Sequence, residues 1–454
     1  MTSRMHSVVS HLASLRIEKL PAKAIASARW CFLDSLGCGL FGADKAWTRI
    51  LAAEIESDGA RGPCTVFGSA QRAAAPAAAL CNGTASHGFE LDDLLDEAIV
   101  HPGAIIVPAV LAAAESRGAS GADVVLGVVA GYEVLDRVGR ALGMEPAHRG
   151  FHKTSLAGPV GAAVAAGVVM KLDVPQLNSA VGLACSAASG IKTFAVGEGG
   201  GMMKRMHAGR AAESGVRMAQ LAARGFSAPP NAVESRFGLL EVFGRQGARP
   251  EALDADMGAP WAVENVYVKV YPCCSWIQSA VQQLVALRGA SALDAEEIRR
   301  VEIGTNSYAR RMNGTVLPTD TMGAQYSIPY CAALALTGDP ADPAMYADAV
   351  LSDVSRRALA QRVELVVDPD MEAMYPQHYG SRVRVELANG EVRQSKVLDP
   401  HGMPADPVTE TERLEKFNRL ASSQLTRPHV DRVIEIVRSL ERQASIAKLS
   451  EVLS

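Results

Sequence analysis

The chain has 454 residues, more than a single hydrophobic core usually serves, so two domains are expected. Apolar residues make up 48% of the chain and charged residues 21%, as in an ordinary soluble globular protein. A net charge of −4 argues against nucleic acid as a partner, and the sequence has no Lys/Arg-rich run that would indicate a membrane surface.

The N-terminal residues 1–11 contain no signal-peptide core. The longest uncharged run, Thr154–Met170, is interrupted by glycine and proline and is too short to span a bilayer, so it predicts a buried helix. The eight cysteines are scattered and lack the spacing of metal ligands. We therefore expect reduced thiols in a cytoplasmic protein.

The segment from Leu20 to about Val263 is predicted to be mainly helical. Only 5% of the chain is aromatic, whereas Ala and Gly are abundant, and small residues let helices pack closely. Short breaks rich in Gly, Pro and Asn separate the helical segments, as in a helical bundle. The clearest predicted helices are Gly121–Gly143, Ser155–Leu172, Val174–Gly190 and His207–Gly225.

The pattern changes near Val266 to short β-branched segments that alternate apolar and polar residues, as half-buried strands do. The turn Asn389-Gly390 predicts a hairpin between the last two of them. The predicted strands are Val266–Tyr271, Ile298–Ile303, Val363–Val367, Val383–Leu387 and Val392–Val397, with helices at Ser275–Leu287 and Tyr330–Leu336.

From Thr409 the pattern is helical again to the end of the chain. The fold class is therefore predicted to be mainly α. A large all-α domain is built from both chain ends, residues 1–264 and 404–454, and a smaller α+β domain covers residues 265–403.

The densest group of ionisable residues lies between His87 and Gly103. Five carboxylates (Glu90, Asp92, Asp93, Asp96 and Glu97) and two histidines (His87 and His101) occur here just before an Ala-rich apolar segment. Charge at this density beside a buried helix is unfavourable unless the groups are paired, solvated or used. A solvated helix cap, an acid/base site and a metal site are all compatible with the pattern. If residues 82–93 are helical, His87, Glu90 and Asp93 share one face.

Two further clusters carry cations. Gly197–Gly209 places Lys204, Arg205 and His207 at the start of a predicted helix, whose N-terminus suits anions, although a glycine loop with solvated basic residues is the alternative. Lys269–Trp276 lies at the domain boundary, where Lys269 could also be a solvated strand-edge lysine.

Together the clusters supply carboxylates, histidines and cations but no cofactor fingerprint. This mixture suits binding a small polyanion and moving a proton on carbon next to a carboxylate. The cations would stabilise the enolate-like charge that develops.

Six motifs in this order resemble the MmgE/PrpD family, which includes dehydratases, a decarboxylase and an epimerase of small polycarboxylates. They are Leu33–Cys38, Asn82–Gly103, Lys204–Gly209, Lys269–Cys274, Ala324–Tyr330 and Gly402–Pro407 with Lys416-Phe417. The resemblance implies a homodimer in which a smaller α+β lid closes over a pocket between the domains. It also implies that no cofactor and no metal is needed.

The resemblance assigns roles to particular positions. His101 falls on the family's catalytic histidine, and Lys204 and Lys269 fall on lysines that would hold substrate carboxylates. Glu90 and Asp93 would orient His101 or carry a second proton. The remaining expected substrate-binding residues are His152, Tyr330, His207, Asp92, Cys274 and His87.

Three positions depart from the family's decarboxylase, which has Asp at Glu90, Thr at Leu94 and His near Cys274. Losing polar contacts from a carboxylate pocket predicts a different substrate. The sequence therefore predicts a lyase, specifically a hydro-lyase, that acts on a small di- or tricarboxylate. The alternative is an epimerase or racemase using the same proton abstraction; a decarboxylase and a non-catalytic carboxylate-binding protein receive less support.

Overall fold

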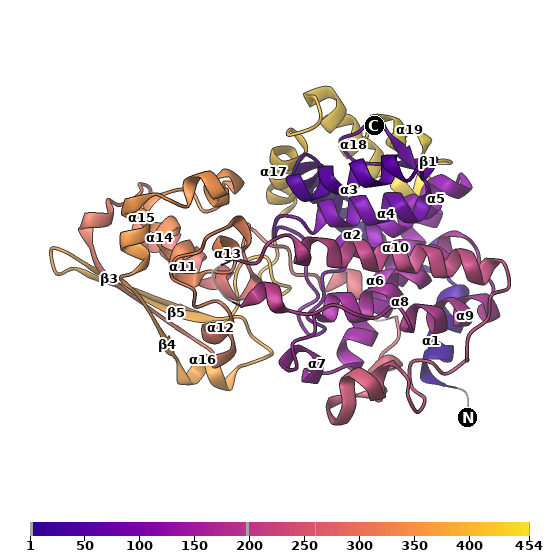
Figure 1. Cartoon of the computed structure of the whole chain (residues 1–454), viewed down its shortest axis with the longest axis horizontal. Helices are drawn as coiled ribbons and strands as arrows, with labels where there is room; N and C mark the ends of the chain where they lie inside the picture. Colours follow the sequence, from indigo (N-terminus) through magenta and orange to yellow (C-terminus); the bar gives the residue numbers. More distant parts are fainter. Residues whose placement is uncertain (1–2, 197–198, 259, 454) are drawn as a thin grey trace.

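The computed structural model describes residues 3–196, 199–258 and 260–453. The chain forms a large helical body and a smaller α+β body, which lie next to each other along the longest axis of the molecule (Figure 1). This arrangement confirms the predicted mainly-α fold class. None of the described helices is both long and apolar enough to cross a membrane.

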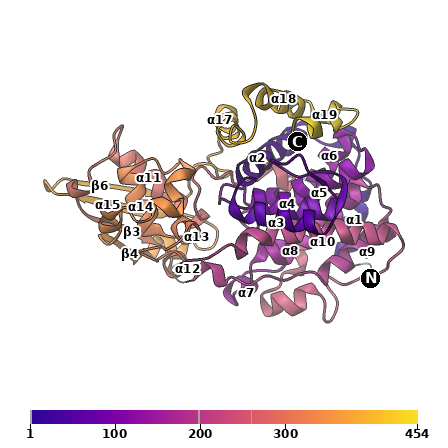
Figure 2. The same ribbon diagram turned by 45° about the horizontal axis from the view of Figure 1, so that its top comes forward.

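The large body contains the N-terminal helices and the C-terminal return. α17 packs against α2, so the last segment of the chain closes onto the first, as Figure 2 also shows. The helices are α1 Arg4–Ala13, α2 Ala22–Gly42, α3 Ala46–Ser57, α4 Ala75–Ser86, α5 Gly103–Arg117, α6 Gly121–Ala141, α7 Glu145–His148, α8 Lys153–Val169, α9 Val174–Cys185, α10 Met203–Ala223, α17 Glu410–Ala421, α18 Arg427–Arg438 and α19 Ala447–Val452; a short hairpin joins β1 Arg61–Thr65 and β2 Arg72–Ala73.

The centre of this body depends on small residues where α4 and α10 cross. A Cβ on Gly83 would lie 2.7 Å from the Gly209 Cα, and a Cβ on Gly209 would lie 2.2 Å from the Leu80 carbonyl oxygen. Both helices lead into the cation and carboxylate clusters, because α4 ends before His87 and α10 begins before Lys204. The close approach therefore sets the distance between the two clusters.

Gly209→Ala is expected to destabilise the protein by about 1–3 kcal/mol, because the added methyl group would press on backbone that cannot easily move. Urea unfolding of the variant measures this loss. The neighbouring exposed position supplies the control: Arg210→Ala should change the free energy of unfolding by no more than about 0.5 kcal/mol. Equal stability of Gly209→Ala and the wild type would show that the crossing can relax.

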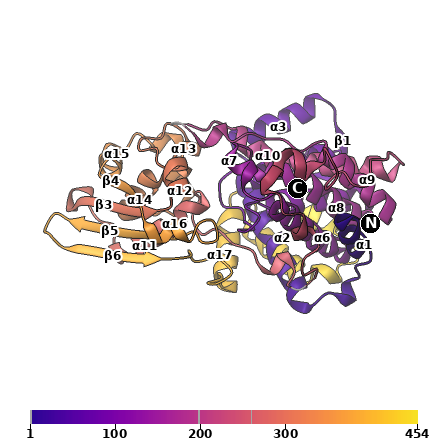
Figure 3. The same ribbon diagram turned by 90° about the horizontal axis from the view of Figure 1, so that it is seen from below.

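The smaller body is built on a four-stranded sheet in the order β4-β3-β5-β6, with β3 and β4 parallel and the other pairs antiparallel (Figure 3). β5 alternates buried and half-buried residues, with Val383 and Val385 facing the core. α11 contacts β5 and β6, and α14 contacts β4. The elements are α11 Gln278–Arg288, β3 Ile298–Thr305, α12 Ser307–Met312, α13 Thr321–Gln325, α14 Ile328–Thr337, α15 Val354–Ala360, β4 Val363–Val367, α16 Pro369–Ala373, β5 Ser381–Leu387 and β6 Val392–Val397.

Two predicted elements were wrong. The Val266–Tyr271 strand does not form: this segment crosses between the bodies and makes one bridge, Tyr267 with Leu94, while the Val268 amide bonds to Gly402. The helix expected to continue through His87 and Glu90 ends at Ser86. Glu90 has a φ of 57°, which a right-handed helix cannot accommodate.

Candidate active site

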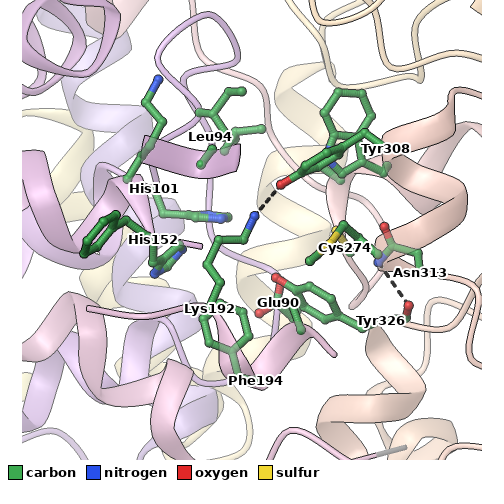
Figure 4. Close-up of a pocket in the computed structure, with 18 of the residues that line it drawn as sticks. Glu90, Leu94, His101, His152, Lys192, Phe194, Cys274, Tyr308, Asn313 and Tyr326 are labelled. Atoms are coloured by element: carbon green, nitrogen blue, oxygen red, sulfur yellow. Dashed lines mark hydrogen bonds between the residues drawn. The ribbon is translucent and has the colours of Figure 1, made fainter. Parts of the chain in front are cut away.

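A pocket lies between the two bodies, where the irregular segment after α4 meets the loop before α10 and the smaller body, which is called the lid below (Figure 4). The large body supplies histidines and the two lysines Lys153 and Lys192, the crossing segment supplies Lys269, and the lid supplies a thiol and aromatic side chains. Residues that line it include Glu90, Leu94, His101, His152, Lys192, Lys269, Cys274, Tyr308 and Tyr326.

His101 is held in one orientation at the pocket wall, just before the N-terminus of α5. Its Nδ1 lies 2.9 Å from the Asp93 carbonyl oxygen and 3.2 Å from Asp92 Oδ2. Both neighbours are acceptors, so Nδ1 carries the proton and the neutral ring keeps a lone pair on Nε2. Burial lowers the pKa of His101, and Asp92 offsets this only in part, so the neutral form suits a general base.

Asp92 joins two histidines beneath the pocket. Asp92 Oδ2 also lies 2.6 Å from Nδ1 of His87, which is fully buried and does not line the cavity. Burial alone would raise the pKa of Asp92, but the two imidazoles outweigh it and hold the pKa well below its ordinary value. His87 and Asp92 were expected to touch substrate; the structure places both behind His101, where they orient it.

Glu90 forms a buried ion cluster instead of contacting His101. Lys204 Nζ donates to Glu90 Oε1 in a very close contact, and Lys269 Nζ donates to Oε2 at 3.2 Å. Nη1 of Arg205 lies 3.8 Å from Oε1 of Glu90. Burial opposes ionisation of Glu90, but the lysines outweigh it and lower its pKa far below the usual range. The structure therefore does not show the expected orienting contact between Glu90 and His101, and an ionised Glu90 cannot donate a proton.

The two predicted lysines differ in their access to the cavity. Lys204 is fully buried behind Glu90 and does not line the pocket, so the expectation that its amine meets a substrate carboxylate is also corrected. Lys269 lines the pocket. Burial would lower the pKa of Lys269, but Glu90 and Asp92 outweigh burial and raise it, which keeps the ammonium charged.

The Asp93 carboxylate stabilises the start of α5 and does not line the pocket. It accepts hydrogen bonds from the Gly103 amide at 2.7 Å and from the Tyr132 hydroxyl at 2.7 Å. Burial, with a further contribution from Asp34, raises the pKa of Asp93 to about 7. Its side chain caps the start of α5, and only its backbone carbonyl reaches His101, so the predicted proton-carrier role does not fit.

His152 lies on the pocket wall with His207 behind it. Their Nδ1 atoms are 2.9 Å apart, so one ring donates to the other. Burial lowers the pKa of both groups, that of His207 to about 4, so both are neutral near pH 7. His207 thus supports His152 and does not itself line the cavity.

Tyr330 does not join the site. Its hydroxyl donates to the Met345 carbonyl at 2.6 Å within the lid core. Tyr326, four residues earlier in the same motif, lines the pocket instead, because it precedes α14 while Tyr330 lies inside that helix. Leu94 and Cys274, two of the positions that depart from the family pattern, both line the pocket.

Sequence reasoning did not identify Lys192 and Tyr308, which face each other across the pocket from the two bodies (Figure 4). Lys192 stands alone in an apolar stretch, and Tyr308 follows a strand with no charged cluster, so neither carries a local signal. Gly197 and Glu198, which begin the predicted anion loop, lie outside the described residues. Further along that loop, the amides of Gly200 and Gly201 bond to Asp320 of the lid.

The one group of described side chains placed to share a metal ion is His87, Asp92 and His101, whose ligand atoms lie within 4.8 Å of one another. Glu90, the carboxylate expected in such a site, is held by lysines. The ammonium groups of Lys204 and Lys269 beside this cluster disfavour a further cation. We therefore interpret the group as an oriented acid/base relay.

Asp92→Asn is expected to reduce kcat by about 10² or more, because an amide can no longer enforce the Nδ1-protonated form of His101. Steady-state kinetics on an accepted substrate measures the loss, with circular dichroism to check the fold. Asp96→Asn, outside this relay, is the matched control and should stay within about twofold of the wild type. Similar kcat values for both variants would contradict the orienting role.

Comparison with known proteins identifies the family. The model of the MmgE/PrpD N-terminal domain matches residues 7–251, and that of the MmgE/PrpD C-terminal domain matches residues 271–442. Cis-aconitate decarboxylase of Aspergillus terreus is 27% identical over 480 residues, covering 100% of this chain and 96% of that protein. Cis-aconitate decarboxylase of Homo sapiens is 26% identical, covering 100% of this chain and 95% of that protein.

A third relative, 2-methylcitrate dehydratase of Cupriavidus necator, is 25% identical over 241 residues, covering 51% of this chain and 49% of that protein. The two family models together match most of the chain, in the order N-terminal domain and then C-terminal domain. The chain belongs to the MmgE/PrpD family. The relatives are named as a decarboxylase and a dehydratase, which places the chain in a family of lyase type.

Proposed function

We propose that the protein is a cofactor-independent lyase that acts on a small di- or tricarboxylate by proton transfer at the carbon α to a carboxylate. The observation that carries this proposal is the oriented, neutral His101 beside the charged Lys269 in one pocket. A base next to a fixed cation is what abstraction of an α-proton requires, since the cation stabilises the enolate-like charge.

In the hydro-lyase form of the reaction, His101 Nε2 takes the α-proton and the C–H electron pair becomes an enolate-like charge beside Lys269. That electron pair then forms the carbon–carbon double bond as the β-hydroxyl leaves with a proton, as water. The second proton must come from another wall of the pocket, because Glu90 is ionised. Tyr308, whose phenol keeps its proton because burial raises its pKa to about 12, is one candidate among the lining residues, whereas His152 is neutral.

Decarboxylation is a second candidate, because the similarity to the cis-aconitate decarboxylases extends over nearly their full length. Against it, Leu94 and Cys274 line the pocket where the decarboxylase pattern has hydroxyl and imidazole side chains. An epimerase or racemase would use the same abstraction and return the proton to the opposite face. We keep the homodimer and the cytoplasmic location as further predictions.

A ¹H NMR screen of small polycarboxylates in deuterated water tests the proposal. A lyase gives an alkene signal, or loss of carbon dioxide with deuterium incorporation at the protonated carbon. Exchange of the α-proton without an alkene or a decarboxylated product would instead identify an epimerase. Ligand-induced thermal stabilisation without turnover of any compound would identify a carboxylate-binding protein and overturn the proposal.

A further inference from the structure

Lys192 occupies a fixed position on the pocket wall that the mechanism above does not use. Residues 190–192 pair with residues 150–152: the His152 amide bonds to Gly190, Phe151 forms a bridge with Ile191, and the Lys192 amide bonds to Gly150 at 2.8 Å. This short ladder ties the backbone of Lys192 to that of His152. The lysine is therefore held beside a pocket histidine by main-chain bonds.

The amine of Lys192 points into the cavity toward the lid (Figure 4). Its Nζ donates to the Tyr308 hydroxyl in a very close contact and lies 5.0 Å from the centre of the Tyr308 ring. A phenol hydroxyl is a neutral partner, so the contact orders the amine without neutralising its charge.

The charge on Lys192 is uncompensated within the part of the chain that the structure describes. Lys204 and Lys269 both pair with Glu90, whereas none of the described carboxylates forms an ion pair with Lys192. Burial lowers the pKa of Lys192 to about 8; Cys274 partly offsets this, and Arg311 lowers it further. A half-buried cation aimed into a pocket without a counter-ion is in an unfavourable position unless an anion enters.

We propose that Lys192 binds a second carboxylate of the substrate and makes the pocket select di- and tricarboxylates over monocarboxylates. This inference rests on the proposed function, in which Lys269 faces the carboxylate next to the reacting carbon. Two cations from separate segments, Lys192 on the loop before α10 and Lys269 on the crossing segment, would then hold two carboxylates on either side of His101. The substrate carboxylate would replace the missing counter-ion, and Tyr308 would keep the amine in place.

The test compares succinate with its half-amide, succinamate, by isothermal titration calorimetry. The wild type is expected to bind succinate at least tenfold more tightly than succinamate. Lys192→Met should weaken succinate binding about tenfold or more and leave succinamate within about twofold, while Lys192→Arg should retain the preference. The matched control is Lys171→Met, an exposed lysine paired with Asp123, which should keep the wild-type ratio.

Equal weakening of both ligands in Lys192→Met would assign Lys192 a structural role and overturn the inference, as would an unchanged succinate affinity. Thermal unfolding of each variant shows whether the fold is intact, and Lys192→Gln replaces Lys192→Met if the latter does not fold. On any substrate found by NMR, Lys192→Met should raise KM about tenfold or more and change kcat less than threefold. Absence of turnover in the wild type with a retained succinate preference would overturn the lyase proposal alone.

Discussion

His101→Ala is expected to reduce kcat by about 10² or more while leaving the fold intact. The physical reason is that the variant loses the imidazole whose Nδ1 is fixed by Asp93 and Asp92, and with it the basic Nε2. Steady-state kinetics on the substrate identified by NMR measures the effect. His429→Ala, an exposed histidine on α18, is the control and should keep wild-type turnover. Near-normal kcat in His101→Ala would remove His101 from the central role.

The pH profile gives an independent test of the same group. A general base must be unprotonated, and burial lowers the pKa of His101 below its ordinary value of 6.5. The acid limb of kcat/KM is therefore expected below pH 6.5, with activity lost as pH falls through the folded pKa. An acid limb above pH 6.5 would contradict this assignment of the base.

Glu90→Gln is expected to lower the free energy of unfolding by about 3–5 kcal/mol. The substitution removes the carboxylate that, among the described residues, pairs with both Lys204 and Lys269, and it leaves two buried ammonium groups together. Urea unfolding measures the loss. Glu97→Gln, an exposed carboxylate in the same segment, is the matched control and should change stability by no more than about 0.5 kcal/mol.

A double-mutant cycle distinguishes the electrostatic contribution of the ion cluster to the free energy of unfolding from the contribution of packing. Lys204→Met in the Glu90→Gln background should recover part of the loss, because one uncompensated charge is removed. Strictly additive losses would contradict a direct Glu90–Lys204 coupling. The pH dependence has a defined sign: the folded pKa of Glu90 is lowered, so its stabilisation is present above about pH 4.5 and lost as pH falls below it.

Several elements begin or end where the sequence predicts. The Thr409 capping box begins α17 where the sequence predicts it, and the strands Val363–Val367 and Val392–Val397 have the predicted bounds. Prediction failed in the segment after α4, where Glu90 adopts a left-handed backbone. That conformation is unfavourable by about 1–3 kcal/mol for a residue other than glycine and persists because the ion cluster around the side chain holds it.

For the site, the sequence predicted some of the residues that line the pocket but not their partners. His101, Lys269, His152 and Cys274 do line the pocket. Helical spacing grouped His87 with Glu90 and Asp93, and the family resemblance assigned the two carboxylates to His101. In the structure an irregular backbone brings Asp92 to His101 instead. Tyr330 was predicted from its motif, yet a helix start separates it from Tyr326 and points it into the lid core.

The sequence by itself determined the mainly-α class, the α+β insertion and a pocket chemistry of histidine, lysine and carboxylate, because periodicity and residue type are local properties. Only the tertiary structure decided which charges neutralise one another. Lys204 and Lys269 lie 114 and 179 positions after Glu90 in the sequence, yet the three side chains meet in one buried cluster. Lys192 has no such carboxylate among the described residues. A local sequence pattern cannot show whether a lysine is paired, so only the structure distinguishes Lys192 from Lys204 and Lys269.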